Sequence, residues 1–173
     1  MKQVTRSGWM AYGVALVVVG ADQVVKAILL GGFDLEDRGA VRLLGPVDLR
    51  LVWNQGISFG LFRYDLAWTR WALAAFALAV AAGLAFWARR ADRPLTGLAV
   101  GLIIGGAVGN LIDRVHFGAV ADFIDATRLY FPWVFNIADS AISVGIALLI
   151  AESLLFPRRA EGERQGRWRR RVE

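Results

Sequence analysis

The sequence predicts an all-α integral membrane protein with four transmembrane helices and a small extracytoplasmic β-sheet cradle in the first outer loop. The main observation is composition. The 173-residue chain is 57% hydrophobic and only 20% charged, which is too apolar a balance for a soluble domain of this size. The second observation is that the apolar residues gather in four segments of helical length. A helix satisfies its own backbone hydrogen bonds, so each segment can cross the hydrocarbon core.

Four charge-poor segments are predicted to span the membrane: residues 8–30, 71–88, 94–112 and 133–156. Lys2 and Arg6 precede the first segment, as they would precede a cleaved secretory signal, but no small-x-small cleavage site closes its apolar core before Asp22. We therefore expect the first segment to stay in the mature protein. The chain contains no cysteine, so neither disulfides nor thiol chemistry are expected.

The placement of arginines predicts the topology, because short cytoplasmic loops retain Lys and Arg. Basic residues dominate the N-terminus, the link between the second and third spans, and the tail, whereas the loops over 31–65 and 113–132 mix arginines with acids. We predict cytoplasmic termini, two outer loops, one membrane domain over 1–156 and a basic cytoplasmic tail over 157–173. The net charge of +5 then reflects topology and attraction to anionic lipid, so we expect membrane lipid as a partner and no nucleic acid.

The first outer loop contains a strand signal. Residues 47–53 alternate apolar and polar side chains, which is the period of a half-buried strand, and residues 54–56 supply a turn. The apolar segment 57–62 is too short to span a bilayer and fits either an interfacial helix or a second strand. We therefore expect a small sheet on the outer membrane surface.

Ionisable residues at membrane depth are candidates for function, because a charge there is costly. Asp22 and Lys26 are spaced i, i+4, so they share a helix face and can pair roughly 20 Å along the first span. A structural ion pair or a snorkelling lysine explains the same two residues. At the outer end of the third span, residues 105–110 are small enough for close helix packing, and Asp113 beside Arg114 is expected to form a loop-fixing pair.

Asp122 and Asp139 differ from these acids, since neither has a basic residue within four positions. Asp139 lies about 25 Å of helix from Phe156, so it too approaches the outer surface. Two carboxylates that converge there can share a proton, as in an aspartic peptidase: the ionised one activates water and the protonated one polarises a scissile carbonyl. Helix capping and turn formation are the alternative roles for both residues.

Five blocks occur in order along the chain: DQVVK (22–26), NQGISFG (54–60), GAVGNLIDR (106–114), VADFID (120–125) and FNIADS (135–140). Together they closely resemble the blocks of the bacterial lipoprotein signal peptidase family, signal peptidase II. The joint occurrence is far more specific than any one block. One departure is visible, because Ser58 stands where the family often has alanine.

The resemblance implies a membrane aspartic endopeptidase that cleaves the signal peptide from a diacylglyceryl-modified prolipoprotein just before the lipidated cysteine. Its catalytic aspartates would match Asp122 and Asp139, without a metal or other cofactor. It also implies a place in the bacterial cytoplasmic (inner) membrane, an active site at the outer face, and inhibition by globomycin. Six further residues are implied to shape the site and two to support it: Asn54, Gly56, Asn110, Asp113, Arg114 and Asn136, then Asp22 and Lys26.

Other mechanisms fit the residues less well. A zinc peptidase would want clustered ligands, and the chain has one histidine, His116. A serine–lysine dyad could combine Lys26 with Ser58 or Ser140, but it would leave both aspartates idle. The alternative from another class is a small four-helix membrane transporter with acidic ion or proton sites, whose acids should lie near the midplane. A non-enzymatic scaffold would tolerate the loss of both aspartates.

Overall fold

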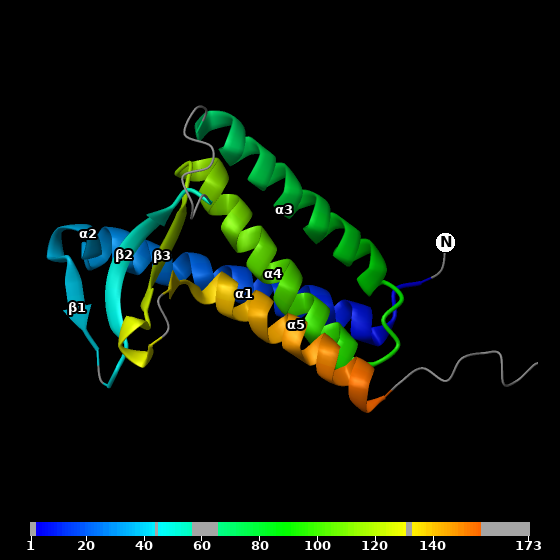
Figure 1. The fold of residues 1–173 in the computed structure, drawn as a ribbon. Helices are drawn as coiled ribbons and strands as arrows, with labels where there is room; N and C mark the ends of the chain where they lie inside the picture. Colours follow the sequence, from blue (N-terminus) through cyan, green and yellow to red (C-terminus); the bar gives the residue numbers. More distant parts are fainter. Residues whose placement is uncertain (1–2, 44, 57–65, 131–132, 157–173) are drawn as a thin grey trace, which may run out of the picture.

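The computed structural model describes residues 3–43, 45–56, 66–130 and 133–156. Within these ranges four helices are long and apolar enough to cross a membrane. They are α1 (Arg6–Ala27), α3 (Leu66–Ala88), α4 (Pro94–His116) and α5 (Ile137–Leu155). α1 continues directly into a π-helical turn over Ile28–Gly32, and the four helices form one bundle (Figure 1).

Helix α4 is the centre of the bundle and packs against α1, α3 and α5. Glycines on α4 allow the close approach of α1. A Cβ atom at Gly101 would lie 2.5 Å from the carbonyl oxygen of Ala11, and one at Gly105 would lie 2.6 Å from Cβ of Val18. Such contacts between small residues hold helices together where the surrounding lipid is as apolar as the side chains.

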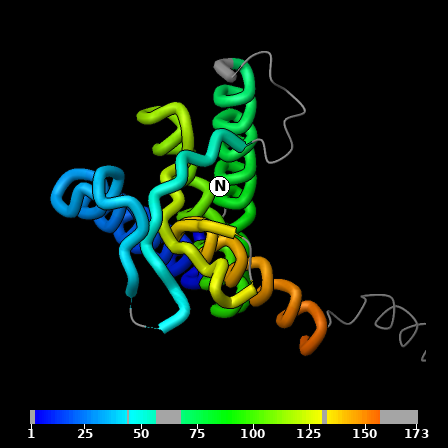
Figure 2. The backbone as a smooth tube through the Cα atoms, turned by 60° about the vertical axis from the view of Figure 1, so that its left-hand side comes forward, coloured from blue at the N-terminus to red at the C-terminus, as the bar shows by residue number. Residues whose placement is uncertain are grey.

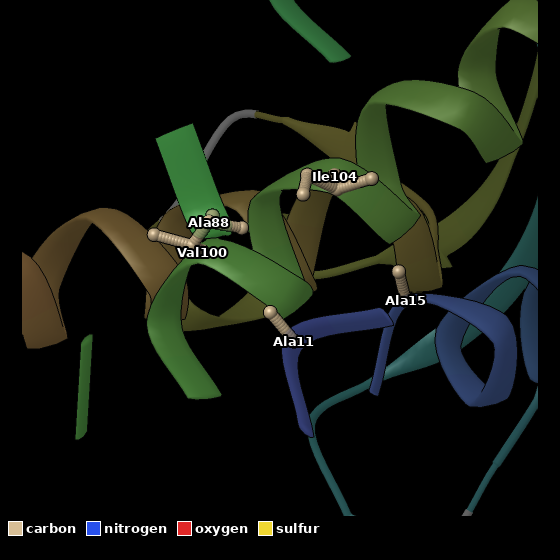
Figure 3. Close-up of a cluster of buried hydrophobic side chains, with 5 residues drawn as sticks. All are labelled: Ala11, Ala15, Ala88, Val100 and Ile104. Atoms are coloured by element: carbon tan, nitrogen blue, oxygen red, sulfur yellow. The ribbon is translucent and has the colours of Figure 1, made fainter. Parts of the chain in front are cut away.

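The interior of the bundle is built from small and branched side chains. Ala11 and Ala15 of α1, Ala88 of α3, and Val100 and Ile104 of α4 lie together where the three helices meet (Figure 3). Large apolar side chains instead cover the outside, among them Leu16, Phe76 and Leu154. An exposed apolar surface of this extent is expected only where another apolar phase covers it, so the arrangement fits a bilayer.

A four-stranded antiparallel sheet lies at one end of the helices, which we call the sheet end (Figures 1 and 2). Its strands follow in chain order: β1 (Ala40–Arg42), β2 (Asp48–Asn54), β3 (Val120–Asp125) and β4 (Val134–Phe135). Leu35, the first residue of the short helix α2 (Leu35–Arg38), packs with Leu29 and Phe123. This small core joins the sheet to the end of the first helix.

The predicted strand over 47–53 is confirmed as β2, but the sheet is not confined to the first long loop. Strand β3 comes from the second long loop, and β4 from the start of the predicted fourth span. Because residues 134–135 pair with β3, α5 begins at Ile137 and not at 133. The segment over 57–62, with Ser58 in it, lies outside the described residues.

Three other helix ends also differ from the prediction. Helix α4 continues to His116, so Asp113 and Arg114 lie on the helix instead of in a loop. Helix α1 begins at Arg6 and α3 at Leu66, two and five residues earlier than predicted. Hydropathy marks the apolar middle of a helix, whereas its polar end turns still satisfy their backbone hydrogen bonds and extend beyond the apolar run.

Candidate active site

Asp122 and Asp139 meet at the sheet end, although different elements carry them. Asp122 lies on β3 with 2% of its surface exposed, and Asp139 is the third residue of α5. Asn136, the residue before α5, contacts both. Its Nδ2 donates to Asp122 Oδ1 at 2.7 Å, and its Oδ1 accepts the backbone N–H of Asp139 at 2.9 Å. One fully buried asparagine therefore fixes the position of each aspartate relative to the other.

Helix α5 begins with a capping box that sets the orientation of Asp139. The Asn136 side chain caps the helix, and Asp139 Oδ2 accepts the Asn136 backbone N–H at 3.4 Å. An acid in the first turn also interacts favourably with the helix dipole. Asp139 thus has the helix-capping role that the sequence analysis gave as an alternative to catalysis. Its second oxygen, Oδ1, faces another partner and accepts from Asn110 Nδ2 at 2.7 Å.

Side-chain amides hold the two carboxylates in place. Asn54, the last residue of β2, donates from Nδ2 to Asp122 Oδ2 at 3.0 Å, so both oxygens of Asp122 have an amide donor. Asn136 Nδ2 also donates to Asn110 Oδ1 at 3.1 Å, which joins the two halves of the site. Amide donors orient a carboxylate without cancelling its charge, so the pair keeps the capacity to take up and release a proton.

The surroundings of Asp122 favour its protonated form. Burial, together with the charge of Asp139, raises the pKa of Asp122 to about 6, although hydrogen bonds from Asn54 and Asn136 and the charge of Lys26 oppose this rise. Burial disfavours the ionised form because the carboxylate loses its hydration. Asp122 therefore retains its proton to a higher pH than an ordinary aspartate does.

Gly56 acts on this pair through Asn54. Its backbone has a φ of +83°, a conformation that favours glycine, and its N–H donates to Asn54 Oδ1 at 2.8 Å. The turn thus fixes one end of the Asn54 amide while the other end donates to Asp122. A side chain at position 56 would strain this turn, and a Cβ atom there would also force the end of the Leu73 side chain to move.

A buried triad of Lys26, Asp22 and Asp113 lies next to the pair. Lys26 Nζ is 2.7 Å from Asp22 Oδ2 and 2.6 Å from Asp113 Oδ2, and none of the three side chains is more than 3% exposed. Two carboxylates around one ammonium group satisfy its charge and hydrogen-bond donors in a buried position. The i, i+4 pair expected between Asp22 and Lys26 is confirmed, with Asp113 as an added member.

The triad also anchors the backbone beside each aspartate of the pair. Asp22 Oδ1 accepts the N–H of Ala138 at 3.1 Å, and Asp113 Oδ2 accepts the N–H of Ala121 at 3.1 Å. Each alanine directly precedes one of the two aspartates in the sequence. Lys26 therefore joins the start of α5 to strand β3 through two charge-assisted contacts, and this connection helps to set the separation of the two carboxylates.

The expected loop-fixing pair of Asp113 with Arg114 is wrong. Both residues lie on α4, where neighbours in sequence point about 100° apart and do not face each other. Asp113 contacts Lys26, whereas Arg114 Nη1 donates to the backbone carbonyl of Asn110 at 3.2 Å. Arg114 also interacts electrostatically with both aspartates of the pair, so it adds positive potential to the site.

Gln23 is a site residue that the sequence argument missed. Its Nε2 lies 3.1 Å from Asp22 Oδ2, 3.0 Å from Asp113 Oδ1 and 3.4 Å from the carbonyl oxygen of Gly109. Gly109 permits this crowding, since a Cβ atom there would lie 2.8 Å from Asp22 Oδ2. The one sequence feature that could have identified Gln23 was a polar amide inside an apolar span. Its adjacency to Asp22 gave no indication that the two shared partners.

Lys26 and Ser140 have contacts that do not suit a serine–lysine dyad. Lys26 Nζ lies 2.7 Å from Asp22 Oδ2 and 2.6 Å from Asp113 Oδ2, so two acids already engage it. The Ser140 hydroxyl donates to the backbone carbonyl of Asn136 at 3.0 Å, as helical serines often do. The other candidate, Ser58, lies outside the described residues. Among the described residues, the contacts of Lys26 and Ser140 therefore do not form such a dyad.

Comparison with known proteins covers almost the whole chain. A family model described as signal peptidase (SPase) II matches residues 14–155. A lipoprotein signal peptidase of Caulobacter vibrioides is 56% identical over 153 residues, which cover 88% of this chain and 90% of the relative. A lipoprotein signal peptidase of Methylobacterium radiotolerans is 45% identical over 150 residues, 86% of each chain.

Two solved structures share the fold of this chain. A bacterial membrane enzyme solved by the in meso method at 1.9 Å resolution aligns with a TM-score of 0.74 and 26% identity, over 91% of this chain and 99% of that chain. A second, solved by the same method at 2.3 Å resolution, shares the fold with a TM-score of 0.71 and 24% identity, over 92% of this chain and 98% of that chain. The chain therefore belongs to the signal peptidase II family and is a peptidase.

Proposed function

We propose that this protein is an aspartic endopeptidase that removes the signal peptide from diacylglyceryl-modified prolipoproteins by cutting just before the lipidated cysteine. The observation that carries the proposal is the buried pair of Asp122 and Asp139, which arrive from separate elements and are joined by Asn136. Relatives named lipoprotein signal peptidase support the prolipoprotein as substrate. An inhibitor of the globomycin type is expected to occupy the same site.

The chemistry follows from one shared proton. Asp122 carries it, because burial raises the pKa of this carboxyl group to about 6, and Asp139 acts as the base. Asp139 takes a proton from water as the water oxygen attacks the scissile carbonyl carbon, while Asp122 donates a hydrogen bond to the carbonyl oxygen. When the C–N bond breaks, a proton passes to the leaving amine. The amides of Asn110 and Asn136 keep both carboxyl groups oriented throughout.

We place the site at the outer face of the bacterial inner membrane, with residues 1–156 as a single membrane domain and residues 157–173 as a basic cytoplasmic tail. The sheet end carries the aspartate pair, whereas Arg89, Arg90 and Arg93 lie in the link between α3 and α4 at the opposite end. The positive-inside rule assigns such a link to the cytoplasm. A lipid-anchored substrate would then reach the pair along the membrane surface.

A transporter is the less favoured alternative. Acidic ion or proton sites of transporters lie near the bilayer midplane. Here, the acids lie close together near the sheet end: Asp22, Asp113, Asp122 and Asp139. Two of the four pair with Lys26. This arrangement suits a reaction at an interface better than passage across a membrane.

The test is direct cleavage. The purified protein is mixed with a diacylated prolipoprotein, and the products are weighed by mass spectrometry. We expect a new N-terminus at the lipidated cysteine, and block by globomycin. An intact substrate, together with ion flux through vesicles that contain the protein, would support the transporter instead.

A further inference from the structure

We propose that the end of the bundle opposite the sheet binds the headgroup of a phospholipid that carries a primary ammonium group, with Glu152 receiving the ammonium and Arg93 the phosphate. This site lies near Thr96, fourteen residues before Asn110 on α4, which is roughly 20 Å from the aspartate pair. Lipid binding there does not depend on the proposed peptidase mechanism.

The first observation is a buried carboxylate that has too few donors among the described residues. Glu152, on the last turns of α5, is 6% exposed. Its two oxygens lie 2.9 Å and 2.7 Å from the hydroxyl of Thr96, but a hydroxyl has one proton, whereas a carboxylate accepts about four hydrogen bonds. A carboxylate at this depth is costly unless further donors or a cation satisfy it.

The cation that the described residues offer to Glu152 is only partly engaged. Arg93 Nη1 lies 3.7 Å from Glu152 Oε1, which is beyond hydrogen-bond distance. The same nitrogen donates to the carbonyl oxygen of Phe156 at 3.1 Å, and the guanidinium lies 5.6 Å from the centre of the Phe156 ring. Arg93 is 45% exposed, so an anion can reach its guanidinium group.

The second observation is a cavity that joins these two groups. It has a volume of about 470 Å³, and both Glu152 and Arg93 contribute to its lining. Thr96 and Glu152 are the buried lining residues, whereas Trp87, Arg93, Ser153 and Phe156 are exposed. A ligand that enters therefore passes a guanidinium group and aromatic rings before it meets the carboxylate.

The chemistry of the lining selects the headgroup. A primary ammonium supplies three hydrogen-bond donors to the carboxylate, whereas the methyl groups of a choline supply none, and an anionic headgroup would bring like charge towards Glu152. In an ethanolamine headgroup only two carbon atoms separate the ammonium from the phosphate, which suits the adjacent Glu152 and Arg93. Trp87 and Leu149 on the lining suit the membrane interface and the start of an acyl chain.

The test measures which lipids stay bound. The full-length protein is released from nanodiscs that contain equal amounts of phosphatidylethanolamine, phosphatidylcholine and phosphatidylglycerol, and its lipid adducts are counted by native mass spectrometry. We expect phosphatidylethanolamine adducts to exceed each of the others by at least about fivefold. Glu152→Gln should remove this preference, while Glu36→Gln, an exposed position on α2 at the sheet end, should retain it.

A folding measurement and a second variant guard against a variant that does not fold. Thermal melting of each variant reports folding, and Arg93→Gln is the second variant if Glu152→Gln does not fold, with loss of the same preference expected. Equal adducts for the three lipids, or an unchanged preference in a folded Glu152→Gln or Arg93→Gln protein, would each overturn the proposal.

Discussion

Asn136 makes more of the contacts that define the candidate site than any single aspartate does. Its side chain caps α5, donates to Asp122 and donates to Asn110. An aspartate at this position would lose the donors and bring a third negative charge to the pair, whereas an alanine would lose the cap as well. The amide is therefore suited to the position by its combination of one acceptor and two donors.

The pH dependence of stability tests the environment of Asp122. Its pKa rises from the ordinary aspartate value of 3.8 to about 6, so the folded protein binds the proton more tightly than the unfolded chain does. Stability from this group is then fully present below about pH 4 and is lost as pH rises through about 6, a change of about 3 kcal/mol at most. Asp122→Asn should remove the loss of stability with rising pH that Asp122 causes. The melting temperatures of the wild type and the variant, recorded from pH 4 to 7.5, measure this effect.

Asp125 supplies a control with the opposite sign. Hydrogen bonds from Thr127 and the charge of Arg50 lower the pKa of Asp125, against a smaller opposing effect of burial. A lowered pKa contributes stability above the ordinary aspartate range and loses it as pH falls through the folded pKa. Asp125→Asn should therefore reduce the loss of stability that the wild-type protein shows as the pH falls through the acid range. An Asp122→Asn protein with the same pH profile as the wild type would contradict the assignment for Asp122.

At the scale of elements, some of the structure was readable from the sequence and some was not. The spans near 71–88 and 94–112 follow from hydropathy, and the alternation over 47–53 indicates β2. Strand β3 was not predicted, because five of its six residues are buried. Such burial removes the alternation that marks a half-buried strand. Its pairing with β2 across a long stretch of chain is a tertiary contact that local patterns do not encode.

The candidate site shows the same division. Motif resemblance identified Asp122, Asp139 and the asparagines, but no periodicity predicts that Asn54 reaches Asp122 across the sheet end. The spacing of Asn136 and Asp139 is that of a capping box, so this local contact was available from the sequence alone. The contact of Lys26 with Asp113 could not be predicted from the sequence alone, since Asp113 lies on a different helix.

Loss of Lys26 should separate structural support from catalysis. Lys26→Met leaves two buried carboxylates without their cation, which costs about 3–5 kcal/mol where one partner of a buried pair is removed. We expect a much lower melting temperature but residual cleavage from the folded fraction at low temperature. Arg128→Met is the matched control, because Arg128 pairs with Asp48 at the surface with 41% exposure, and such pairs contribute about 1 kcal/mol or less.

The result for Lys26 also bears on the rival mechanism. If Lys26→Met folds normally and binds globomycin but turns over no substrate at all, the lysine takes part in the chemistry. A serine–lysine mechanism would then replace the aspartate pair.

At the scale of the whole molecule, the proposed orientation is the property that gives the site its access to substrate. Reporter fusions after Arg159 should behave as cytoplasmic, and fusions near Asp37 as external, because the basic residues gather in the tail and in the link at the end opposite the sheet. The reverse pattern would place the aspartate pair on the cytoplasmic side, where it would not meet exported prolipoproteins.

The most direct test of the account is the cleavage rate of three variants on a diacylated prolipoprotein: Asp122→Asn, Asp139→Asn and the double mutant. Each substitution keeps the size of the side chain but replaces a titrating acid with an amide, so each single variant should lose about 100-fold to 10,000-fold in rate or more. Because the two carboxyl groups act on one water molecule, the double mutant should be scarcely slower than either single variant. Asp125→Asn should retain measurable cleavage. An Asp139→Asn protein that cleaves at a near-normal rate, beside an inactive Asp113→Asn protein, would contradict the assignment of the pair.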